Sequence, residues 1–210
     1  MGQTAADIPV LDETEPAWAV AELFPAQGQW TEDDYLDITD STNRLVELVD
    51  GRLEVLPMPT IGHQLIVMFL CDVLREFVKP RNLGVVIFAA LRVRLRERNI
   101  REPDVVFKTR EHLDPQADRY WEKADLVMEV VSADAKSRER DWVVKRQEYA
   151  QAGIAEYWIV DPQQQRVVVL RLDGDHYVTH SEAGANGEVC SALLAGFAVD
   201  AAHIWAAAKP

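Results

Sequence analysis

The chain has 210 residues, enough for one full domain and too few for two of ordinary size. Its 48% hydrophobic and 27% charged residues are typical of a globular protein, and no apolar run approaches the roughly 18–20 residues of a membrane span. The net charge of −13 argues against a protein that coats nucleic acid non-specifically, because phosphate contacts need clustered Lys and Arg.

The cysteines and the N-terminus indicate in which compartment we expect the protein. Cys71 and Cys190 form no CxxC pair, so neither a disulfide framework nor a cysteine zinc site is indicated. The N-terminus lacks a basic segment followed by an apolar core, so we expect no secretory signal and a cytoplasmic location. Residues 1–28 are acidic and proline-containing, which predicts an N-terminal arm before a single domain at residues 29–210.

The N-terminal half predicts a helix and a hairpin, then a longer helix and more strands. Thr31 is a plausible helix N-cap, with acidic residues following in the first turn. Asp50-Gly51 lies between two apolar runs, which is a strong signal for a hairpin turn. Apolar residues recur at helical spacing from about Ile61 to Val78. Gly84–Leu95 reads as one strand region, and DVVF, which begins at Asp104, reads as another short strand.

The C-terminal half predicts a buried strand, a helix and a further hairpin. The run DLVMEVVS, Asp125–Ser132, is typical of a strand covered on both faces. A helix is expected from about Ser137 to Ala152, followed by a strand at Ala155–Val160 and its hairpin partner at Arg166–Leu172. A small helix is expected near Asp200–Ala208. This order predicts an α/β (α+β) fold with a central mixed sheet flanked by helices.

Three carboxylates lie among apolar strand residues. Glu129 interrupts DLVMEVVS near its middle, where an ionised carboxylate costs several kcal/mol unless it is paired. Its partner would be a positive side chain, a metal ion or a proton. Asp104 opens DVVF, and Glu47 lies inside RLVELV. If the three carboxylates converge, they form an oxygen-rich site of the kind that suits Mg²⁺.

The arginines are unevenly distributed, and five of them fall within ten residues: Arg92, Arg94, Arg96, Arg98 and Arg101. They are consistent with a phosphate-facing strip. A solvated sheet face, with arginines paired to the surrounding acidic surface, would give the same pattern.

Several of these segments together resemble a known family. ELVDG, PDVVF, DLVMEVVS, a K-x-x-x-Y helix and AEYWIVDP, in this order and spacing, resemble the Uma2 family of the PD-(D/E)xK nuclease superfamily. The resemblance runs from about Trp30 to the C-terminal helix. It implies a restriction-endonuclease-like fold and a Mg²⁺- or Mn²⁺-dependent endodeoxyribonuclease, a hydrolase that cuts phosphodiester bonds in DNA.

The resemblance also implies roles for individual residues. Asp104 and Glu129 would be the metal-binding carboxylates, and the backbone carbonyl of Val130 would complete the protein ligands. The superfamily lysine is expected at position 131, where this chain has valine, so Lys145 in the following helix is the candidate replacement. Glu47 would assist at the metal or hold a water molecule.

Other interpretations of these residues remain open. Glu129 would serve equally well in a structural ion pair with an arginine, and Lys145 in a solvated pair with Asp141. The valine at position 131 and the acidic net charge also suit a catalytically inactive nuclease-fold protein that acts as a regulatory or protein-binding module. An exposed hairpin or sheet edge would suit a homodimer. Lys145 pointing into solvent, away from both carboxylates, would exclude its catalytic assignment.

Overall fold

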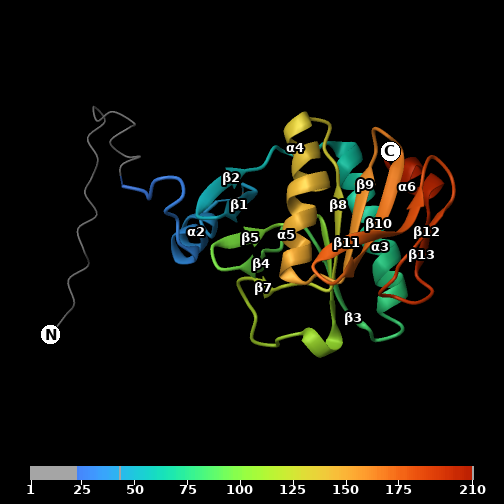
Figure 1. Ribbon diagram of the computed structural model, residues 1–210, viewed down its shortest axis with the longest axis horizontal. Helices are drawn as coiled ribbons and strands as arrows, with labels where there is room; N and C mark the ends of the chain where they lie inside the picture. Colours follow the sequence, from blue (N-terminus) through green and yellow to red (C-terminus); the bar gives the residue numbers. More distant parts are fainter. Residues whose placement is uncertain (1–22, 43, 210) are drawn as a thin grey trace.

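The computed structural model describes residues 23–42 and 44–209, and Figure 1 shows how its elements are arranged. Most of the expected N-terminal arm, residues 1–22, therefore lies outside the described residues. A smaller sheet with the first helix lies to the left in Figure 1, and a larger sheet with its covering helices lies to the right.

The smaller sheet begins with the predicted helix and hairpin. Helix α2, Glu32–Thr39, starts with a capping box in which Thr31 and Asp34 bind each other's backbone N–H groups. The hairpin turn has positive φ at Asp50 (49°) and Gly51 (72°), as a type I′ turn requires. The strand order is β2-β1-β5-β4-β7, with bounds β1 Val46–Val49, β2 Arg52–Val55, β4 Val93–Arg96, β5 Asn99–Arg101 and β7 Trp121–Glu122.

The larger sheet is mixed, as predicted. Its order is β11-β10-β9-β8-β6-β3, with bounds β3 Gly84–Phe88, β6 Val105–Thr109, β8 Leu126–Val130, β9 Glu156–Asp161, β10 Arg166–Asp173 and β11 His176–Ala183. Strand β8 runs parallel to β9 and antiparallel to β6. A small sheet of β12, Glu188–Cys190, and β13, Ala198–Asp200, precedes helix α6, Ala201–Ala207. The expected α/β fold with helices flanking a mixed sheet is confirmed.

Helices cover both faces of the larger sheet (Figure 1). Helix α3, Ile61–Val78, contacts β3, β6 and β8 on one face. The other face is covered by one continuous helical segment with α4 Ala135–Glu139, a π-helical turn Arg140–Val144 and α5 Lys145–Ala152. Within the described ranges, no helix is long and apolar enough to cross a membrane.

Two of the differences from the predicted boundaries have an identifiable cause. The region Gly84–Leu95 is not one strand, because β3 ends at Phe88 in the larger sheet and β4 begins at Val93 in the smaller one. Both halves of the region do form strands, but nothing in their residues indicates that the chain changes sheets between them. The second helix begins at Ala135 rather than Ser137, because Asp134 accepts the Ser137 N–H as its N-cap.

The alternation of side chains along β8 decides where Glu129 points. Leu126, Met128 and Val130 belong to the core on the α3 face, whereas Val127 and Val131 belong to the core that contains Tyr149 of α5. Odd-numbered residues of this strand therefore face α5. Glu129 points toward the helix that carries Lys145.

Candidate active site

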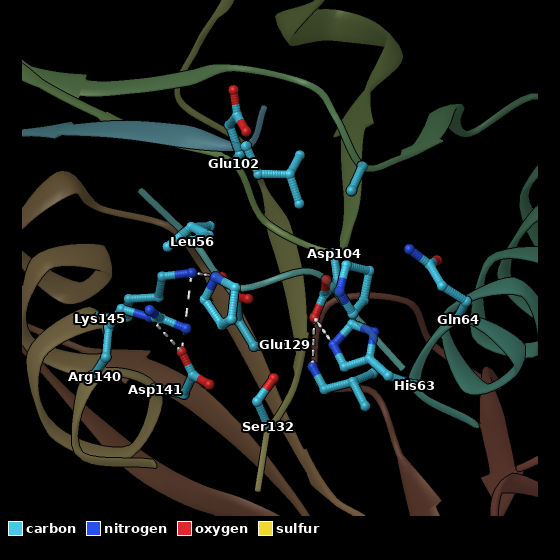
Figure 2. A pocket seen from close by; sticks show the side chains of 15 residues that line it. Leu56, His63, Gln64, Glu102, Asp104, Glu129, Ser132, Arg140, Asp141 and Lys145 are labelled. Atoms are coloured by element: carbon cyan, nitrogen blue, oxygen red, sulfur yellow. Dashed lines mark hydrogen bonds and ion pairs between the residues drawn. The ribbon is translucent and has the colours of Figure 1, made fainter. Parts of the chain in front are cut away.

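A pocket of about 50 Å³ lies where the two sheets meet the start of α3 and the 135–152 helical segment. This volume has room for an ion and a few water molecules. Charged side chains converge on it from four elements, as Figure 2 shows, and its lining includes His63, Glu102, Asp104, Glu129, Asp141 and Lys145.

Asp104 is positioned by the pairing of two central strands. The register Val105↔Met128 of β6 and β8 places Asp104 one step beyond the paired residues, beside Glu129 and Val130. Its Oδ2 accepts a hydrogen bond of 2.8 Å from the Val130 N–H. Its Oδ1 accepts no hydrogen bond from any residue that the structure describes, so this oxygen remains available in the pocket.

Glu129 and Lys145 form a direct buried ion pair. The Lys145 Nζ lies 2.8 Å from the Glu129 Oε1, and the Tyr149 hydroxyl donates to the same oxygen at 2.6 Å. Lys145 is 2% exposed, so it does not point into solvent. Tyr149, four residues after Lys145, therefore holds Glu129 in place. The second oxygen, Oε2, accepts no hydrogen bond from the described part of the chain.

Burial and charge oppose each other in this pair. Burial raises the pKa of Glu129 above the usual range of a carboxyl group, and the Lys145 ammonium offsets only part of that rise. Burial alone would lower the pKa of Lys145, but the carboxylates of Glu129, Glu47 and Asp141 raise it overall. Lys145 is therefore held as a cation beside the pocket.

Glu47 lies behind Lys145 and not in the pocket wall. It is fully buried, with the Arg101 Nη1 at 2.7 Å from its Oε2 and the Lys145 Nζ at 3.3 Å from its Oε1. Burial raises its pKa, but Lys145 and Arg101 lower it to about 2. Glu47 is thus a permanent anion that orients Lys145, and any influence on the pocket passes through that lysine.

His63, which follows Gly62 near the start of α3, is a further residue of the pocket. Its Nε2 lies 3.4 Å from the Asp104 Oδ2, and its Nδ1 is buried without a hydrogen-bond partner among the described residues. Burial lowers the pKa of His63, but Asp104 and the Val130 backbone raise it overall. His63 therefore adds positive character beside Asp104.

Sequence reasoning missed two acidic residues of the pocket. Asp141 was considered only as a surface partner of Lys145, yet it is 2% exposed and lies 3.9 Å from the Lys145 Nζ. Glu102 was not singled out at all. Its signal was its place two residues before Asp104, because alternate residues of an extended segment share a face. Burial and the Glu47 charge raise the pKa of Glu102 to about 7.

Comparison with known proteins shows the family and the fold of the chain. The Uma2 family pattern, described as "Putative restriction endonuclease", matches residues 32–202. The chain belongs to the Uma2 family. A crystal structure described as a "putative nuclease belonging to DUF820", from Anabaena variabilis ATCC 29413, is similar at 16% identity. The structural match covers 82% of this chain and 98% of the Anabaena chain, with a TM-score of 0.66, which shows that the two share a fold. A search of curated proteins found no match.

The pocket of this Uma2 protein fits a hard divalent cation in its donor chemistry. Asp104 and Glu129 each present one uncommitted carboxylate oxygen, and Mg²⁺ in proteins takes one or two carboxylates and keeps several waters. Among the described residues no three acidic, histidine or cysteine side chains converge as a ready cage. The residues therefore suit an ion that is largely hydrated, held by two carboxylates.

The five arginines do not form a free phosphate-facing strip. Arg92 pairs with Asp40, Arg94 with Glu32 and Glu122, Arg96 with Asp50, and Arg101 with Glu47 and Glu148, while Arg98 donates to the backbone oxygens of Gly28 and Trp30. The structure thus agrees with the other interpretation of the sequence, in which the arginines pair with acidic residues nearby. They bind the parts of the smaller sheet together.

Proposed function

We propose that this protein is a metal-dependent endonuclease that hydrolyses phosphodiester bonds in DNA. The observation that carries the proposal is the meeting of Asp104, Glu129 and Lys145 at one pocket, although they come from three separate segments. Membership of a family described as "Putative restriction endonuclease" and the shared fold of a described nuclease support the same chemistry.

Asp104, Glu129 and the backbone carbonyl of Val130 would hold Mg²⁺ or Mn²⁺. A bound divalent cation polarises a phosphate oxygen and lowers the pKa of a bound water. The carboxylates would orient that water, and Asp104 is itself held in place by the Val130 N–H.

Lys145 would take the place of the lysine expected at position 131. Val131 is apolar, packs in the core beside Tyr149 and does not line the pocket, so this residue supplies no charge there. Lys145 reaches Glu129 from the facing helix instead. Its ammonium would stabilise the negative charge that develops on the phosphate, while Glu47 keeps it oriented from behind.

The test is cleavage of plasmid DNA with Mg²⁺ or Mn²⁺ by the full chain. We expect activity in the wild type, and its loss in Asp104→Asn and Glu129→Gln, because each removes a charged oxygen ligand. Glu182→Gln, on the exposed part of β11, is the matched control and should cleave normally.

A second measurement separates metal binding from catalysis. Mn²⁺ should raise the unfolding temperature of the wild type, because an ion that binds only the folded state stabilises it, and Asp104→Asn should lose this shift. Cleavage that survives Glu129→Gln would exclude the mechanism. A folded wild type that neither cleaves DNA nor binds Mn²⁺ would favour the inactive regulatory module.

A further inference from the structure

A second and larger pocket, of about 420 Å³, adjoins the first and has no role in the chemistry above. It falls within the roughly 300–1,000 Å³ typical of small-molecule sites. Leu45 and Glu102 line both pockets, so the two are neighbours with a shared wall. The remaining polar lining consists of Thr39, Thr42, Arg44, Arg92, Asp118 and Arg119.

Glu102 offers an unused acceptor at this shared wall. The residue is 8% exposed, and its Oε1 lies 3.5 Å from the Tyr35 hydroxyl. Its Oε2 is buried and has no hydrogen-bond partner in the described part of the chain. Figure 2 shows the Glu102 carboxyl set apart from those of Asp104 and Glu129. An unsatisfied buried carboxylate oxygen is costly, so a ligand that supplies N–H donors would be favoured there.

The arginines supply the opposite hydrogen-bonding character. Asp40 accepts from the Arg92 Nη1 and from the Arg119 Nη2, both at 2.7 Å, which fixes the two guanidinium groups beside each other. Each guanidinium has five N–H donors, so most of them remain available. Leu45 and Leu91 add apolar surface to the same wall. The pocket thus combines a buried acceptor, fixed donors and an apolar lining.

We propose that this second pocket binds a guanine base of the nucleic-acid substrate, next to the phosphate held at the first pocket. The placement beside the cleaved phosphate rests on the proposed nuclease function. Guanine presents two N–H donors, N1 and N2, on one edge and the acceptors O6 and N7 on the adjoining edge. A carboxylate accepts from the first edge, and arginine donates to O6 and N7.

The other bases fit the pocket less well. Cytosine and adenine each present one amino group to a carboxylate, and thymine or uracil presents acceptors on both sides of its single N–H. A guanine bound through N1 and N2 is also unpaired, since these atoms form its Watson–Crick edge. The site therefore takes a guanine from a single strand or one turned out of a duplex.

The experiment measures binding without catalysis. Isothermal titration calorimetry of the full chain, with EDTA and at mildly alkaline pH, compares the 5′-monophosphates of deoxyguanosine, deoxyadenosine, deoxycytidine and thymidine. We expect the deoxyguanosine nucleotide to bind about tenfold or more tightly than the others, as one well-made bidentate contact provides. Glu102→Gln should sharply reduce this preference, because its amide keeps one acceptor oxygen and turns an N–H group toward the other guanine N–H.

Arg119→Ala and Arg96→Ala form a matched pair. Both side chains are half-exposed and paired with an aspartate, but only Arg119 lines the pocket, so only Arg119→Ala should weaken deoxyguanosine nucleotide binding. Equal binding of all four nucleotides would overturn the proposal, since the arginines would then recognise phosphate alone. A guanine preference undiminished in Glu102→Gln would also overturn it. Guanine binding without DNA cleavage would refute the proposed nuclease activity and still support the proposed guanine site.

Discussion

Replacing Lys145 by methionine tests whether the buried ion pair organises the candidate site. The substitution keeps most of the side-chain volume and removes the charge 2.8 Å from Glu129 and 3.3 Å from Glu47. At an effective dielectric constant of 20, the attraction to Glu129 is worth about 6 kcal/mol, before the cost of desolvating both ions. Removing one partner of such a pair typically destabilises a protein by about 3–5 kcal/mol, which is what we expect here.

A double-mutant cycle isolates the pair from other effects of the substitution. Glu129→Gln removes the charge that Lys145→Met leaves uncompensated, so the double variant should be more stable than the two single losses predict, by about 2 kcal/mol. Urea unfolding of all four proteins, with EDTA present, measures the four free energies of unfolding. Losses that add within about 0.5 kcal/mol would refute the reasoning, because residues that do not interact behave in that way.

Three further predictions concern the fold around the site. Glu156→Gln should lower the free energy of unfolding by about 2 kcal/mol in urea, because its buried carboxylate accepts from Trp158, Ser191 and two backbone N–H groups that an amide NH₂ cannot satisfy. Gly84→Ala should cost about 1–3 kcal/mol by thermal unfolding, because the added Cβ would lie 2.1 Å from a backbone carbonyl oxygen of β6. Burial raises the pKa of Asp161, but the Arg138 guanidinium lowers it, and the net pKa lies below the usual carboxyl value. The pair therefore stabilises the fold at pH values above the pKa of the unfolded carboxyl group. This stabilisation is lost as the pH falls through the lower pKa of the folded state. The stability difference between the wild type and Arg138→Met should therefore shrink on acidification, and a difference that grows would contradict the assignment.

The long, strongly patterned elements were predictable from local rules. Helix Ile61–Val78 and the hairpin at Asp50-Gly51 occur where expected, because helical periodicity and a positive-φ dipeptide act over a few residues. The division of 84–95 between two sheets was not predictable, because each half has an ordinary strand pattern.

The residues around Glu129 are enough to establish that it needs a positive side chain, a metal ion or a proton, because a lone carboxylate in a buried strand is costly whatever the fold. Which partners it has was decided only in three dimensions. The period-two alternation of β8 turns Glu129 toward α5, where Lys145 and Tyr149 bind the same oxygen. Glu47 was expected to assist at the metal, but it is buried in an ion pair with Arg101, whereas Glu102, which was not singled out, lines the pocket. Contacts between residues far apart in the chain determine which acidic residues line the pocket, and no local sequence pattern predicts such contacts.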